Sequence, residues 1–194
     1  MANSCSDIIQ EWRFSKDAIN KMNQIIDKTK IIERGGVLCG ADAQAKAINE
    51  GTKKINVISE CKGNRCSVET GSWKECTQRN FVPMGNFHTH PGNIIKTQPS
   101  IGDLGFLSVH GALMCIGAPK AKEDSIICIK QKSLNKEDEL YRNKKLDEMY
   151  RLETKIKNLP FAATKKEREE YDKRFKDIFP GKYYYTFDPN ECVK

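Results

Sequence analysis

A histidine pair separated by one residue, His88-Thr89-His90, constrains this chain more than any other feature of its sequence. The 194-residue chain contains only three histidines, and two of them lie here, directly before Pro91. Successive side chains of a β-strand point to opposite faces of the sheet, so residues i and i+2 share a face. If this segment is a strand, both imidazole rings can reach one metal ion.

A second motif, Ser100-Ile101-Gly102-Asp103, begins a predicted helix that runs from about Ser100 to His110. Ser is a strong N-cap residue, and an acidic residue three positions later completes a capping box at the positive end of the helix dipole. A Ser-x-x-Asp motif alone is more often a helix cap than a functional site. Together with the two histidines, however, it favours a metal site in which Asp103 is the third protein ligand. Three protein ligands leave a fourth position open for water, as in catalytic zinc sites.

These residues resemble the signature of the JAMM (MPN+) metallopeptidase family, which is written H-[ST]-H-P followed by S-x-x-D. The family also has a glutamate ahead of a glycine-rich apolar strand, and the segment from Glu33 to Gly40, E-R-G-G-V-L-C-G, fits that pattern. The resemblance covers roughly residues 20–131. Nine residues separate His90 from Ser100, which is longer than the family's usual spacing, so we expect a longer loop beside the site.

The resemblance implies a zinc-dependent peptidase or isopeptidase with His88, His90 and Asp103 as the metal ligands. Zinc lowers the pKa of a bound water toward about 7 and polarises the scissile carbonyl. Glu33 would be the general acid/base, and Ser100 would donate a hydrogen bond to the tetrahedral oxyanion. The substrate that the family implies is the C-terminal tail of a ubiquitin-like protein, or a conjugate formed through it.

Two other functions compete with this hypothesis. A non-catalytic MPN-type scaffold would bind a partner without cleaving it, but such scaffolds typically lack part of the ligand set, which is intact here. A zinc nucleobase deaminase also activates a water, but it requires H-x-E with P-C-x-x-C, and neither occurs in this sequence. Glu33 also has a structural interpretation, as a surface residue ahead of a strand.

The fold class that we predict is α/β. It is a three-layer α-β-α sandwich with a curved mixed sheet, of the MPN and cytidine-deaminase-like type. Residues 1–132 form the predicted metallopeptidase core, and residues 133–194 form a charged helical extension packed on it. We further expect a helix over residues 7–30, a polar loop or irregular hairpin over 59–80, and helices over 135–158 and from Thr164 onward.

The composition of the chain limits which binding partners and which cellular location we expect. The net charge is +7, but the basic residues are mixed with acidic ones, which indicates solvated helical faces and makes nucleic acid a secondary hypothesis. The sequence has no apolar stretch long enough to span a membrane, and its first residues lack the pattern of a signal peptide. We therefore predict a cytoplasmic protein without a membrane partner. The oligomeric state, the modifier and the linkage are not specified by the sequence.

The chain has eight cysteines, which is a high count for a cytoplasmic protein. Cys39, Cys115 and Cys128 lie in apolar runs and are expected to behave as small apolar side chains. Cys61, Cys66 and Cys76 have two interpretations: a second, structural zinc site, or a hairpin with free or disulfide-linked cysteines. The second interpretation is favoured, because the sequence contains no C-x-x-C motif.

Overall fold

The computed structural model describes residues 12–29, 31–40, 53–57, 61–62, 73–90, 97–119, 126–157 and 165–192. Their contacts group them into two compact units. The first unit holds the described residues up to Gln98, residues 112–129 and those from Thr186 onward, and the second holds residues 99–111 and 130–185. The domain boundary predicted between residues 132 and 133 stays a prediction.

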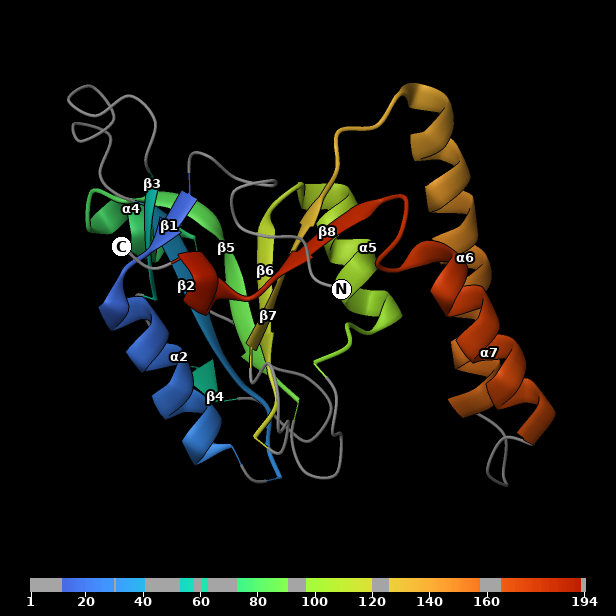
Figure 1. Cartoon of the computed structure of the whole chain (residues 1–194), viewed down its shortest axis with the longest axis horizontal. Helices are drawn as coiled ribbons and strands as arrows, with labels where there is room; N and C mark the ends of the chain where they lie inside the picture. Colours follow the sequence, from blue (N-terminus) through green and yellow to red (C-terminus); the bar gives the residue numbers. More distant parts are fainter. Residues whose placement is uncertain are drawn as a thin grey trace. The chain divides into compact units, whose positions relative to one another are not determined.

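One mixed sheet forms the framework of the first unit (Figure 1). Its strands are β1 (Trp12–Phe14), β2 (Arg34–Gly40), β3 (Lys53–Val57), β4 (Cys61–Lys62), β5 (Val82–Thr89), β6 (Leu113–Gly117), β7 (Ile126–Gln131) and β8 (Tyr184–Phe187). The order is β1-β3-β2-β5-β6-β7-β8, with β4 also paired to β2. The β1–β3 and β5–β6 pairs are parallel, while β2 and β6 pair antiparallel with their other described neighbours. The predicted α/β class with a mixed sheet is confirmed.

Helix α2 (Lys16–Lys28) covers one face of this sheet, where it contacts β2, β3, β5 and β6 (Figure 1). The helix begins after Ser15, whose side chain accepts a hydrogen bond from the backbone N–H of Ala18 at 3.0 Å. Its buried side chains recur at helical spacing and form one apolar stripe: Ala18, Ile19, Met22, Ile25 and Ile26. Leu38 of β2 and Phe87 of β5 meet this stripe in a single core.

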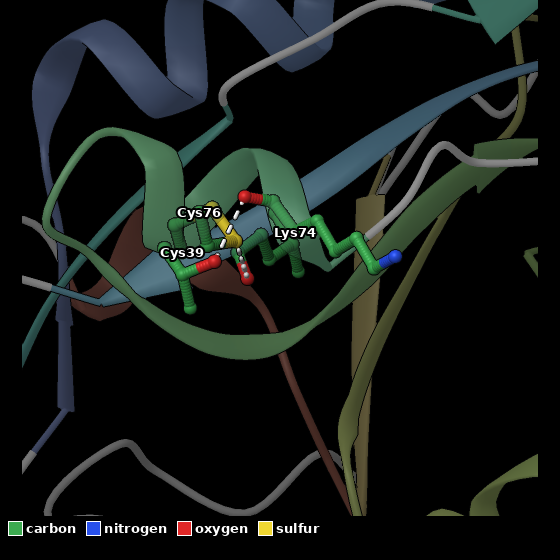
Figure 2. Close-up of a disulfide and its surroundings, with 5 residues drawn as sticks. Cys39, Lys74 and Cys76 are labelled. Atoms are coloured by element: carbon green, nitrogen blue, oxygen red, sulfur yellow. Dashed lines mark hydrogen bonds between the residues drawn. A yellow bond between two sulfur atoms is a disulfide. The ribbon is translucent and has the colours of Figure 1, made fainter.

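The opposite face of β2 is covered by the short helix α4 (Lys74–Gln78). Val37 and Cys39 point to this face and pack with Cys76 and Phe81. Cys39 and Cys76 form a disulfide that joins β2 to α4, with Cα atoms 5.6 Å apart (Figure 2). Within the first unit the sheet therefore lies between two helices, in agreement with the predicted layering.

A second disulfide joins Cys115 of β6 to Cys128 of β7, which the antiparallel register places directly opposite each other. Cys39, Cys115 and Cys128 are buried among apolar side chains as expected, but each of them also forms a disulfide that was not predicted for it. The hypothesis of a second zinc site is contradicted at Cys76, since its sulfur is bonded to Cys39. These pairings depend on strand register and on the position of α4, which sequence spacing does not reveal. Cys66 lies outside the described residues.

The second unit is helical. It contains α5 (Ile101–His110), α6 (Lys136–Lys157) and α7 (Lys165–Ile178), and α6 lies beside both α5 and α7 (Figure 1). Gly111 ends α5 in the left-handed conformation with φ of 59°, as expected of a C-terminal glycine. The predicted helices over 100–110 and 135–158 are confirmed, while Thr164 lies outside the described residues. None of the described helices has the length and apolar character that a bilayer span requires.

Two local predictions are wrong in detail. The helix expected over residues 7–30 begins only at Lys16, because Trp12–Phe14 pairs with β3 as a parallel strand; residues 7–11 lie outside the described part of the chain. The segment 59–80, expected to be a loop or irregular hairpin, contains β4 and α4. The disulfide to Cys39 secures α4, so tertiary contact overrides a weak local pattern there.

Candidate metal centre

The histidine pair lies at the end of β5. His88 is in the strand and His90 follows it, and both side chains are buried, with exposed fractions of 6% and 8%. Their Nε2 atoms lie 3.3 Å apart, and the ring planes are tilted by 57°. Thr89, between them, has no exposed surface and points to the other face of the strand, toward α2. The two rings therefore converge on one side of the sheet.

The separation of the two Nε2 atoms suits a shared metal ion. In a tetrahedral site with metal–nitrogen bonds of about 2.0–2.1 Å, two ligand atoms lie about 3.3–3.4 Å apart. The observed 3.3 Å matches that spacing. The same distance also fits a long hydrogen bond between the two rings, with one of the two nitrogens protonated. The spacing of the two nitrogen atoms is therefore compatible with a shared divalent ion.

Backbone contacts fix the position of His90. Its N–H donates to the carbonyl oxygen of Gly117 at 2.9 Å, which extends the parallel pairing of β5 with β6 beyond Thr89. Gly117 is close-packed against α2: a Cβ atom added there would lie 2.6 Å from Cγ1 of Ile26 and 3.2 Å from Phe87. The residue next to His90 in the sheet is therefore required to be small.

Ser100 and Asp103 form the capping box expected at the start of α5. The Ser100 hydroxyl accepts from the Asp103 N–H at 3.1 Å, while Oδ2 of Asp103 accepts from the Ser100 N–H at 2.7 Å and from the Ser100 hydroxyl at 2.8 Å. Both bonds that Ser100 donates to the carboxylate go to Oδ2, so Oδ1 lies outside the capping box. The positive end of the helix dipole stabilises the negative charge.

This geometry bears on the role predicted for Ser100. A serine hydroxyl has one proton, and here that proton is directed at Asp103. Ser100 could donate to an oxyanion only by giving up this bond. As it stands, the residue orients the Asp103 carboxylate, and its role as an oxyanion donor stays a prediction.

Glu33 lies immediately before β2 and is largely buried, with 9% of its surface exposed. The antiparallel register pairs Gly35 with His88 and ends there. At the next position the Arg34 N–H donates to the side chain of Thr89 at 3.0 Å. Glu33 therefore comes directly before the residue that contacts the end of β5, and its place beside the histidine pair stays a prediction. The surface interpretation of Glu33 does not fit this burial.

Among the described residues, His88, His90 and Asp103 form a group that could hold a metal ion. The ligand atoms that they offer lie within 4.8 Å of one another, two of the residues being buried and the third half-buried. Two imidazoles and one carboxylate are a ligand set that zinc accepts, with one position left for water. These are the three ligands predicted from the sequence.

Three residues around the histidine pair have no role that was predicted from the sequence: Thr29, Thr89 and Gly117. Thr89 lies within the His-Thr-His motif, so its position was visible, but nothing in the sequence showed what its hydroxyl contacts. Thr29 and Gly117 have no local signal at all, since they reach the site only through the packing of α2 on the sheet.

Comparison with known proteins gives distant likenesses to solved structures alone. No protein-family model matches the chain, and no curated protein matches it. One matching solved structure is a JAB1/MPN domain protein from Archaeoglobus fulgidus, aligned with 14% identity and a TM-score of 0.39 over 61% of this chain and 88% of that chain. A likeness this distant carries no argument about metal content or activity, which depend on the residues described above.

Proposed function

We propose that this protein is a zinc-dependent peptidase or isopeptidase of the JAMM type. Its substrate would be the C-terminal tail of a ubiquitin-like protein, or a conjugate formed through that tail. The observation that carries the proposal is the spacing of the ligand atoms: two buried Nε2 atoms 3.3 Å apart, in a group with Asp103 that could hold one metal ion. The family resemblance of the motifs supplies the substrate class.

The proposed chemistry assigns one task to each residue. His88, His90 and Asp103 would hold the zinc ion, which would lower the pKa of a bound water and polarise the scissile carbonyl. Hydrolysis adds the oxygen of a water molecule to the carbonyl carbon and breaks the C–N bond. The Glu33 carboxylate accepts a proton from the water and delivers it to the departing nitrogen. Ser100 holds Asp103 in place through the two bonds to Oδ2.

The test compares the wild-type protein with Glu33→Gln on fusions that carry candidate ubiquitin-like C-terminal tails. Glu33→Gln is nearly isosteric but cannot take up a proton, so cleavage should fall by about 10²–10⁴-fold while bound zinc is retained. Asp27→Asn, which changes an exposed carboxylate on α2, is the matched control and should cleave normally. Cleavage by Glu33→Gln at the wild-type rate would remove the general-base assignment.

Metal content separates the proposal from its alternative. The purified wild-type protein should contain one zinc ion per chain. A protein without stoichiometric metal that still binds a ubiquitin-like partner would instead be a non-catalytic MPN-type module.

The cytoplasmic location predicted from the sequence belongs to the same proposal and has its own test. Disulfides persist mainly in oxidising compartments, so the bonds Cys39–Cys76 and Cys115–Cys128 oppose a cytoplasmic location. Alkylation of free cysteines in freshly lysed cells tests this location. If these four cysteines resist alkylation, they are disulfide-bonded in the cell, which would contradict the cytoplasmic prediction.

A further inference from the structure

Two buried threonine hydroxyl groups form a short hydrogen-bonded chain in the first unit, on the face of β5 opposite the histidine pair. Thr29, at the C-terminal cap of α2, and Thr89, the last residue of β5, have side-chain oxygens 2.8 Å apart. The Thr29 oxygen also lies 2.8 Å from the carbonyl oxygen of Ile25, and the Thr89 oxygen accepts from the N–H of Arg34 at 3.0 Å. Only 3% of Thr29 and none of Thr89 is exposed, so the two hydroxyl groups are shielded from water, while the bond from Arg34 is partly buried.

Counting protons gives this chain a direction. The Ile25 carbonyl cannot donate, so the Thr29 hydroxyl must donate to it. The short contact between the two threonines then uses the proton of Thr89, with the carbonyl of Arg34 as its more distant alternative at 3.3 Å. The resulting order runs from the Arg34 N–H to Thr89, to Thr29 and to Ile25. Each hydroxyl donates once and accepts once, which strengthens bonds in a buried chain.

This chain ends at the peptide that carries the proposed general base. The Arg34 N–H belongs to the peptide bond that links Glu33 to Arg34, and Thr89 lies between the two histidines. The bond from Arg34 to Thr89 thus holds the Glu33 segment against the strand end that carries His90, from the face opposite the imidazole rings. Thr29 supports that bond by fixing the rotamer of the Thr89 hydroxyl.

We propose that Thr29 is a positioning residue for the reaction: through Thr89 it holds the peptide bond between Glu33 and Arg34 against the end of β5. This inference rests on the proposed function, because it assigns Thr29 a task in a reaction for which Glu33 is the base. Thr29 lies outside the His-x-His and Ser-x-x-Asp motifs and touches neither substrate nor metal. Loss of its hydroxyl should therefore affect the rate of cleavage and leave the metal ligands unchanged.

The test uses Thr29→Val, which keeps the shape of the side chain and removes the hydroxyl. Misplacement of a catalytic group by a fraction of an ångström to 1 Å costs about ten- to a hundredfold in rate, so kcat should fall in that range while KM and bound zinc stay unchanged. The Arg34 amide should exchange with solvent about fivefold faster, as the loss of one net hydrogen bond predicts. Thr29→Ser, which restores the hydroxyl, should recover both values.

Ser15→Ala is the matched control for helix stability. It removes the cap at the other end of α2, where the Ser15 oxygen accepts from Ala18, and that end is remote from the histidine pair in the chain. The control should lower the denaturation midpoint without changing kcat or the exchange of the Arg34 amide. If Thr29→Val fails to fold, Thr29→Ala, which removes the methyl group as well, takes its place in the same comparison.

Two results would overturn the positioning role. One is wild-type kcat in Thr29→Val with faster exchange at Arg34, which would make the hydroxyl chain purely structural. The other is an equal loss of kcat in Ser15→Ala, which would trace the effect to helix stability. If the wild-type protein binds no zinc and cleaves no fusion, the proposed function is refuted, and the positioning role with it. Comparing the exchange of the Arg34 amide in the wild-type protein and in Thr29→Val would still show whether the hydroxyl chain exists.

Discussion

Gly117 offers a sensitive test of the packing of α2 on the sheet. Gly117→Ala should destabilise the wild-type protein but stabilise a variant that lacks the Ile26 side chain. A Cβ atom at this position would lie 2.6 Å from Cγ1 and 2.7 Å from Cδ1 of Ile26, and 3.2 Å from a ring carbon of Phe87. The first two separations are below any ordinary carbon–carbon contact. Gly117→Ala must therefore displace the Ile26 side chain, or shift α2 against β6.

The expected change in the free energy of unfolding for Gly117→Ala combines two opposing effects. Inserting a methyl group into a close-packed core costs about 1–3 kcal/mol. Ala is otherwise favoured over Gly inside a strand by about 0.5–1 kcal/mol, because it loses less backbone entropy on folding. With Ile26 present the clash dominates, so Gly117→Ala should destabilise the fold by about 1–2 kcal/mol after this offset. In an Ile26→Ala background both clashing carbons are gone, and the same substitution should stabilise by up to about 1 kcal/mol.

Urea denaturation of the four proteins of this double-mutant cycle measures the coupling. Ile26→Ala alone should cost about 2–5 kcal/mol, since Ile26 is almost fully buried. Residues in contact should couple, whereas independent sites would add within about 0.5 kcal/mol. If Gly117→Ala had the same effect in both backgrounds, the claimed packing of α2 against β6 would be wrong.

Three further predictions concern other parts of the chain. Asp103→Asn should lose zinc, measured by metal analysis, yet keep the helix cap, because the N-cap residue is Ser100 and its hydroxyl still accepts from the backbone N–H at position 103. Full zinc occupancy would mean that another residue completes the site. Replacing Cys39 and Cys76 by Ala should lower the free energy of unfolding by about 4 kcal/mol, and replacing Cys115 and Cys128 by about 3 kcal/mol, as urea denaturation measures. The difference arises because the closed loops span 37 and 13 residues. If the wild-type protein were equally stable with and without a reductant, both bonds would be contradicted. Burial, aided by Glu153 and Asp172, raises the pKa of Tyr171 from 10.0 to about 12. Stability should therefore fall as the pH rises from 10 toward 12, and Tyr171→Phe should lose that dependence in a pH series of thermal melts.

Several features of this protein follow from local sequence alone. The strand that ends in His88-Thr89-His90, the helix that begins at Ser100 and its glycine stop at Gly111 were all predicted, because alternation, N-capping and left-handed glycine are local effects. The α/β class follows from such elements. The three metal ligands could be proposed because two short motifs carry all of them.

The tertiary structure decided what lies around those motifs. The disulfides Cys39–Cys76 and Cys115–Cys128 depend on strand register and on α4, and the hydroxyl chain from Ile25 to Arg34 depends on how α2 packs behind β5. The contact of Arg34 with Thr89, beside the proposed general base, follows from the pairing of β2 with β5. These contacts join residues that are far apart in the chain, and their energies come from burial and pairing in the folded state, which no local pattern encodes.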